Sequence, residues 1–335
     1  MASGDDTAMQ HLSWPKMVRA NDGALILAYS AGIGHNKGAS GLAWSVSRDG
    51  GLSFSPPALL CYFPRDDARY HDVGNMAMGI GAEGAVILLA MAYQGEVAST
   101  VLGWRSADCG RSWQRCDTSA LAENRTGSVF GHIFAVPGRG LAVSGHFRSP
   151  HTPGIWLAYS MDDGHSWGPP QTVTTELFFE PVFVHAGGRL IGLVRENKAC
   201  AYHQFVSDDG GMTWQMVWEE THAWNVAVSP DYDNDQTLWA TLMSNSPMLG
   251  TAFILSHDGG ETWQAAGQEA VHRRAFLRAC TPRPIIKHAA AKVNRRQAAL
   301  GRRSSAGRHR LRPRGPLLTL SALMSRNWPR PVRNS

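Results

Sequence analysis

Short apolar stretches of strand length alternate with clusters of turn-forming residues along most of the chain. Examples are residues 24–29, 41–46, 85–91 and 154–159, which are rich in Val, Ile, Leu, Ala and aromatic side chains. Each stretch is bounded by Gly, Asn, Asp or Ser, the residue types that favour tight turns. Runs of this length and composition are typical of strands joined by hairpins, so the pattern predicts an all-β fold.

An eight-residue pattern recurs at the end of five of these stretches. It reads Ser-x-Asp-x-Gly-x-[Ser/Thr]-[Trp/Phe]. The aspartate can accept bonds from backbone N–H groups ahead of it, and the glycine allows a positive φ. The aromatic residue then buries a large apolar surface. Each of these segments, which we call octets, is therefore predicted to form the tip of a β-hairpin. The five octets are residues 47–54, 106–113, 160–167, 207–214 and 256–263.

The octets begin 59, 54, 47 and 49 residues apart, which is the length of a four-stranded propeller blade. This repeat resembles the Asp-box, or BNR, repeat of the sialidase (neuraminidase) superfamily. The resemblance implies a sialidase-like β-propeller, six-bladed when intact, with about five blades recognisable here. It also implies that the octets are structural, because hairpin tips on the outer side of a blade lie far from the central channel.

Composition divides the chain at the end of the repeats. Residues 271–335 contain 17 Lys and Arg and no acid, which leaves 15 basic against 27 acidic residues before them. We therefore predict an incomplete Asp-box propeller over residues 1–268 and a basic tail over 269–335. One interpretation of the tail is a disordered basic segment that binds nucleic acid or an acidic surface. The interpretation we favour is a shift of reading frame that replaces a sixth blade.

Little in the sequence points to export, a membrane or a cofactor. The five cysteines are irregularly spaced, which favours neither a disulfide framework nor a zinc site. The first residues carry Asp5 and Asp6 and form no apolar signal segment, and the longest apolar run is too short to cross a bilayer. As written, the chain is expected in the cytoplasm, without cofactor, specific nucleic acid or membrane as partners. The sequence predicts no oligomeric state.

Glu180 and Arg195 are the strongest candidates for chemistry. Residues 177–184 and 189–197 are predicted to form a hairpin that brings both side chains to the same end of the channel. The pair resembles the sialidase arrangement in which a glutamate activates a tyrosine nucleophile and an arginine binds the substrate carboxylate. The alternatives are structural: Glu180 caps a turn, or Arg195 forms an ion pair with Glu180 or Glu196.

Other positions of the family pattern are not matched. Ser13 stands where the resemblance implies a first arginine, and residues 34–37 lack the expected acidic residue. The third arginine is missing near residues 246–250, and the tail that should supply the nucleophile contains no tyrosine. This departure keeps two further hypotheses open, a non-catalytic carbohydrate-binding propeller and a truncated, inactive homologue.

Histidines recur at positions where channel-facing residues are expected. They suit acid–base chemistry near neutral pH, and they could also coordinate a metal with Asp72 and Glu180. The metal alternative is the weaker one, because no tight ligand spacing occurs. For each histidine alone, a hydrogen-bonded structural role is the simpler interpretation. The histidines in question are His11, His35, His71, His132, His146 and His222.

These observations favour a glycoside hydrolase of the exo-sialidase type. Its substrate would be a carbohydrate that carries a carboxylate. We predict Glu180, His71 and Asp72 as catalytic residues. The predicted substrate-binding residues are Arg195, His132, His35, Asn75 and His222.

Overall fold

The computed structural model describes residues 9–95, 98–121, 126–147, 153–196, 201–221, 223–231, 234–244 and 251–267. These residues form twenty strands and one short 3₁₀ turn, η2 (Ser119–Leu121). The described part contains no helix long and apolar enough to cross a membrane. The predicted all-β class is confirmed. The predicted tail, residues 269–335, lies outside the described residues.

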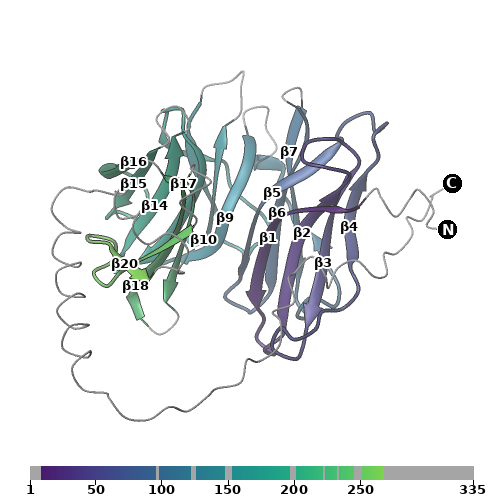
Figure 1. Cartoon of the computed structure of the whole chain (residues 1–335), viewed down its shortest axis with the longest axis horizontal. Coiled ribbons are helices and arrows are strands. Elements are labelled where there is room, and N and C mark those ends of the chain that lie inside the picture. Colours follow the sequence, from purple (N-terminus) through teal and green to yellow (C-terminus); the bar gives the residue numbers. More distant parts are fainter. Residues whose placement is uncertain are drawn as a thin grey trace, which may run out of the picture.

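The strands form successive antiparallel sets of four, which we number sheets 1 to 5 (Figure 1). Sheet 1 contains β1 (His11–Arg19), β2 (Leu25–Gly32), β3 (Ser40–Ser47) and β4 (Ala58–Phe63). Sheet 2 contains β5 (Asp72–Ile80), β6 (Val86–Gln94), β7 (Ala98–Ser106) and β8 (Gln114–Arg115). Sheet 3 contains β9 (Thr126–Val136), β10 (Gly140–Phe147), β11 (Ile155–Ser160) and β12 (Gln171–Thr174). Sheet 4 contains β13 (Phe179–Ala186), β14 (Arg189–Glu196), β15 (Ala201–Ser207) and β16 (Gln215–Thr221). Sheet 5 contains β17 (Ala223–Asp231), β18 (Asn234–Ser244), β19 (Thr251–Ser256) and β20 (Gln264–Gly267).

The first strand of each sheet packs against the first strand of the next, so β1, β5, β9, β13 and β17 line the interior of the arrangement. Where a sheet lies between two others, its second strand is buried on both faces. In β6, Val86 and Leu88 pack in the core shared with sheet 1, whereas Ile87 and Leu89 pack in the core shared with sheet 3. This explains why the second strands are continuous apolar runs.

Two local features differ from the sequence prediction. Sheets 2 and 3 join into one eight-stranded sheet, because β5 and β9 pair in parallel. Gly79 permits this pairing, since a Cβ there would lie 2.1 Å from the carbonyl oxygen of Ile133. In sheet 5, residues 229–236 are rich in Asp and Asn, which favour turns, yet β17 continues to Asp231 and β18 starts at Asn234.

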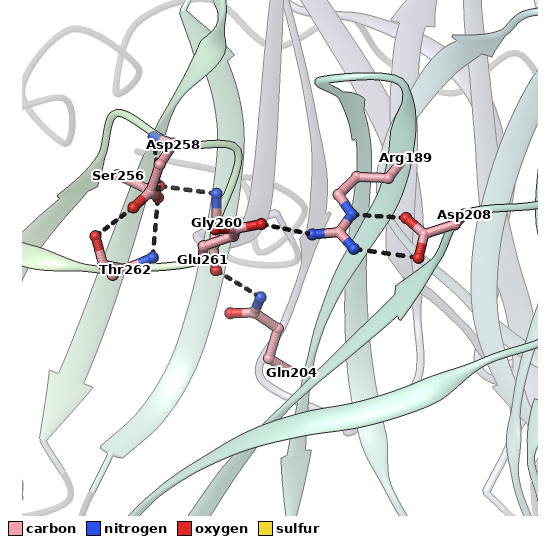
Figure 2. A network of polar contacts seen from close by, with 8 residues as sticks. All are labelled: Arg189, Gln204, Asp208, Ser256, Asp258, Gly260, Glu261 and Thr262. Atoms are coloured by element: carbon pink, nitrogen blue, oxygen red, sulfur yellow. Dashed lines mark hydrogen bonds and ion pairs between the residues drawn. The ribbon is translucent and has the colours of Figure 1, made fainter.

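The five octets form the predicted hairpin tips, and each repeats one set of hydrogen bonds. In the fifth octet, the Ser256 hydroxyl donates to Asp258 and accepts the Gly260 N–H, while Thr262 donates its N–H and hydroxyl to Asp258 (Figure 2). These bonds hold the pKa of Asp258 below its usual range, although burial opposes them. Every donor lies within four residues of its acceptor, so the turn is specified by its own sequence.

Four of the octets also dock onto the preceding sheet. A side chain on the third strand of that sheet donates to an octet carbonyl, as Gln204 does to Gly260 over 2.8 Å (Figure 2). Arg189 adds an ion pair that spans 3.5 Å to Glu261 of the fifth octet, besides its bonds to Asp208. The octet tryptophan packs into the core between the two sheets, as Trp263 does against Val206 and its neighbours. The other three carbonyl contacts are Trp44 to Gly110, Arg105 to Asp163, and Tyr159 to Gly210.

The first octet lacks this docking contact among the described residues. Gly51 is half-buried, whereas the equivalent glycines of the other octets, Gly110, Gly164, Gly211 and Gly260, are buried. A Cβ on Gly51 would meet only Leu25 of its own sheet within 4 Å. Among the described residues, sheet 1 therefore has one neighbouring sheet, sheet 2.

Candidate functional site

The octets and the candidate chemistry lie at opposite ends of the sheets. In sheet 4, the octet begins at Ser207, which pairs with Leu190 near the start of β14. Arg195 lies near the opposite end of β14. We call the end that carries the octets the octet end and the opposite end the site end. The site end holds the first residues of β1, β5, β9 and β13, so side chains from four sheets gather there.

Bulges at the site end re-aim side chains from three of the inner strands. The strand register shifts at Trp14 in β1, at Asn75 in β5 and at Glu180 in β13. All three residues have a positive φ, of 50°, 37° and 49° respectively. Bulky residues adopt this conformation only when surrounding contacts hold it, and such residues concentrate at functional sites. The bulges therefore mark the site end as the place to look for chemistry.

Glu180 and Arg195 meet directly at the site end. Arg195 lies opposite Phe179 in the β13–β14 register, and its Nη1 atom is 2.9 Å from Oε2 of Glu180. The side chains are 12% exposed for Arg195 and 20% exposed for Glu180, so the ion pair is mostly buried but open to solvent at one side. Oε2 of Glu196 lies 3.0 Å from Nε2 of His203.

Lys16 of β1 brings a second positive charge near Glu180. Its Nζ atom lies 4.9 Å from the centroid of the Phe130 ring, and burial lowers the pKa of Lys16 to about 8, although Glu180 opposes the shift. Burial also raises the pKa of Glu180, and the positive charges of Arg195 and Lys16 counteract part of this rise. The Glu180 carboxylate thus lies near two cations, Arg195 and Lys16, in a partly buried site where charge interactions are stronger than in water.

Tyr202 is the tyrosine nearest to this pair in the strand register. It lies on β15 opposite Arg195 and is fully buried, and its hydroxyl has no hydrogen-bond partner. Burial raises the pKa of Tyr202, and the charge of Glu180 adds to the rise while Arg195 opposes it. A buried neutral phenol of this kind is poorly suited to attack a substrate.

A line of hydrogen bonds runs from sheet 2 to the backbone of Glu180. Asn75 donates to the Ser128 hydroxyl over 3.3 Å, and that hydroxyl lies 3.3 Å from Nδ1 of His146. The backbone N–H of Glu180 donates to the same Nδ1 over 3.4 Å. Asn75, one of the predicted substrate-binding residues, is thus linked to Glu180 through sheet 3.

His71, Asp72 and His35 form a second cluster between sheets 1 and 2. Asp72 is buried and accepts the N–H of Gly38 with both carboxylate oxygens at 3.1 Å. Burial raises the pKa of Asp72, while the Gly38 bond and the nearby His71 and His35 counteract the rise. His71 places Nε2 2.9 Å from the carbonyl oxygen of Asp67. Asp72 therefore anchors the loop that carries His35.

This second cluster borders the first through Trp14. The exposed His35 ring lies 4.8 Å from the Trp14 ring and 6.1 Å from that of His11. Trp14 fits closely over Gly74, where a Cβ would lie 2.5 Å from the indole. Because Gly74 precedes Asn75, the two clusters meet along the start of β5. The chemical roles predicted for His71, Asp72 and His35 stay predictions.

The remaining predicted residues are less central. His132 is half-buried and lies farther along β9 than Ser128, beyond Gly131. His222 lies outside the described residues. No group of three or more His, Cys, Asp and Glu side chains that could hold a metal ion occurs in the part of the chain that the structure describes.

Comparisons with known proteins agree with the repeat and the fold. The BNR/Asp-box repeat family matches residues 205–216 and 254–265. A sialidase named Hadza microbial sialidase Hz136 superposes with a TM-score of 0.62 at 19% identity, over 78% of this chain and 58% of that one. Trypanosoma rangeli sialidase in complex with sialic acid gives 0.55 at 14% identity, over 74% and 46%. A protein of unknown function from Dyadobacter fermentans DSM 18053 gives 0.58 at 16%, over 77% and 83%.

The chain has the sialidase-type β-propeller fold. Two of its five octets match the BNR/Asp-box repeat, and its neighbours among solved structures share the fold. The superposed part of this chain covers about half the length of each of the two sialidases. Within the described residues, Glu180 and Arg195 are the site residues that the sequence placed together and the structure joins. Lys16, Ser128 and Tyr202 were missed. Lys16 and Ser128 meet their partners across neighbouring sheets, whereas Tyr202 lies opposite Arg195 within sheet 4.

Proposed function

We propose that this protein is a sialidase-like glycoside hydrolase that acts on a carbohydrate carrying a carboxylate. The observation that carries the proposal is the Glu180–Arg195 pair at 2.9 Å, at the site end of a sialidase-type propeller. Hydrolysis of an acidic sugar requires a cation for the carboxylate and a side chain that moves a proton. Both are present within one ion pair.

Arg195 would bind the carboxylate of the sugar. A guanidinium offers parallel N–H donors that match the two oxygens of a carboxylate. On binding, the substrate carboxylate would share or replace the contact that Glu180 now makes. Lys16 would add a second cation, compensating for Ser13 at the place where the resemblance implied an arginine.

Glu180 would move the proton. Its pKa is raised by burial, and a carboxyl group whose pKa lies closer to neutrality is a better general base or acid at neutral pH. When Arg195 turns to the substrate, Glu180 loses part of the interaction that favours its charged form. Proton transfer to Glu180 would therefore become easier in the complex.

The other predicted residues would serve the rest of the sugar. His71 and Asp72 would form the second proton-transfer group, while His35, Asn75, His132 and His222 would bind hydroxyl groups. The Trypanosoma rangeli neighbour, solved with sialic acid, supports an acidic sugar as the ligand class. The buried Tyr202 makes a protein nucleophile from the described residues unfavourable, so direct attack by water activated by Glu180 is the step we propose.

The test is hydrolysis of fluorogenic sialosides and uronides by the purified full chain. We expect turnover, with kcat lowered at least ~100-fold in Glu180→Gln, because that is the typical contribution of a general acid–base group. Glu176→Gln is the matched control, since Glu176 is exposed at the entrance to the same strand. Turnover that survives in Glu180→Gln would contradict the role of Glu180. Binding of the sugars without turnover would favour a carbohydrate-binding protein instead.

A further inference from the structure

The bulge in β13 leaves backbone polar groups of Glu180 and Pro181 outside the β13–β14 ladder. The register passes from Phe179 opposite Arg195 to Val182 opposite Leu193, so these two residues share one position of the partner strand. Unpaired backbone groups in a partly buried region need other partners. The structure supplies them from the neighbouring sheet 3.

Two side chains of β10 satisfy these groups. His146 accepts the Glu180 N–H at Nδ1 over 3.4 Å. The Ser144 hydroxyl shares its hydrogen between the carbonyl oxygens of Phe130, at 3.0 Å, and Pro181, at 3.2 Å. His146 is 6% exposed and Ser144 is fully buried. Because residues two apart on a strand project from the same face, one face of β10 holds both sides of the bulge.

The Glu180 N–H also determines the hydrogen-bond direction in the rest of the line. Since it is a donor, Nδ1 of His146 must be unprotonated there, and the ring proton lies on Nε2. The Ser128 hydroxyl, 3.3 Å from Nδ1, can then only donate to it. Ser128 in turn accepts from the Asn75 amide, which agrees with the Asn75 Nδ2 atom facing it at 3.3 Å. Nδ1 has one lone pair, so the Glu180 N–H and the Ser128 hydroxyl share it in a three-centre hydrogen bond.

We propose that His146 and Ser144 are positioning residues that hold Glu180 in its left-handed, bulged conformation and thereby aim its carboxylate at Arg195. Ser128 contacts the His146 imidazole and Asn75 donates to Ser128, so these two residues help to orient the ring. The role in turnover rests on the proposed function, whereas the role in holding the bulge does not. His146 packs its ring 5.4 Å from that of Phe179, so the residue before the bulge is held by the same side chain.

The matched variants are His146→Leu, which removes the acceptor, and His146→Asn, whose amide oxygen can take the place of Nδ1. We expect the Glu180 amide to exchange with solvent at least tenfold faster in His146→Leu and close to the wild-type rate in His146→Asn, measured by NMR hydrogen exchange. The Gly211 amide at the octet end, which donates to Ser207, is the internal control and should be unchanged. If turnover is present, kcat should fall about 100-fold in His146→Leu with a smaller change in KM, because misplacing a catalytic group by about 1 Å costs that much.

Ser144→Ala keeps the test open if His146→Leu does not fold, since it removes only one oxygen atom from the second contact. It should raise Glu180 amide exchange without affecting Gly211. Equal Glu180 exchange in all variants, or a parallel rise at Gly211, would overturn the proposal. Absence of turnover in the wild-type protein would refute the proposed function, while the exchange rates would still decide the positioning role.

Discussion

The octet end and the site end of the same sheets are built in opposite ways. At the octet end, the same set of short-range hydrogen bonds occurs in all five octets, and four of the octets make the same kind of contact with the preceding sheet. At the site end the bulges carry different residues, and positive-φ residues such as Trp14 and Glu180 contact partners in other sheets, Gly74 and His146 respectively. Repetition thus secures the fold at one end, which leaves the other end free to carry charge and strain.

The largest effect should come from breaking one docking contact at the octet end. In Gly164→Ala, a Cβ would lie 2.4 Å from the Ile87 side chain of sheet 2, and φ is 84°. We expect a loss of about 2–4 kcal/mol in the free energy of unfolding, from overpacking and the left-handed backbone together. Urea denaturation followed by tryptophan fluorescence measures it.

The control is Gly51→Ala in the undocked first octet. The position within the octet and the sign of φ are the same, but the new methyl group would meet only Leu25, at 3.4 Å. We expect a loss of about 1 kcal/mol, from the backbone alone. Equal losses in the two variants would show that docking contributes nothing to stability.

A smaller effect should follow from removing the cation at the site end. Arg195→Met leaves the Glu180 carboxylate with Lys16 as its remaining neighbouring cation. Because the pair is not fully buried, we expect a loss of about 1–2 kcal/mol at pH 7, below the range for breaking a buried pair. Adding Glu180→Gln should recover part of it, since no carboxylate is then left unpaired. A double-mutant cycle by urea denaturation measures the coupling, and a cycle that sums to zero would contradict the ion pair.

The smallest and most diagnostic effect should be the pH dependence of Glu180→Gln. Burial raises the pKa of Glu180 in the folded state above its ordinary value of 4.5, so the folded protein binds this proton more tightly than the unfolded chain does. The contribution of Glu180 to stability is therefore present at low pH and is lost as pH rises through the folded pKa. We expect Glu180→Gln to gain stability relative to wild type across that interval and to match it below pH 4. Thermal unfolding at several pH values measures the difference, and a gap that narrows with rising pH would reverse the assigned shift.

The contrast between the two ends also explains what the sequence could predict. The hydrogen bonds of each octet lie within eight residues, so the octet is recognisable from sequence, as with Ser256, Asp258 and Thr262. The strands before each octet are predicted from their apolar runs. Glu180 and Arg195 were within reach for a similar reason, because adjacent strands of one hairpin carry them.

Contacts between sheets were not predictable from the same pattern. A bulge moves the following side chains to the other face of a strand, and a sequence pattern does not show where the register shifts. Lys16 approaches Glu180, and Asn75 approaches Ser128, only after such shifts and after the sheets have packed. The parallel joining of β5 to β9 depends likewise on one glycine, Gly79, in a strand that otherwise looks ordinary.

The docking of the octets has a direction. In each of the four contacts, the later sheet places its turn on the sheet that precedes it in the chain, as the fifth octet does on Gln204. During synthesis, the ribosome therefore releases the docking surface on each earlier sheet before it releases the octet that binds there. Each new hairpin can therefore dock on a sheet that has already been synthesised. This limits the time for which a large β-protein exposes hydrophobic surface and unpaired strand edges that promote aggregation.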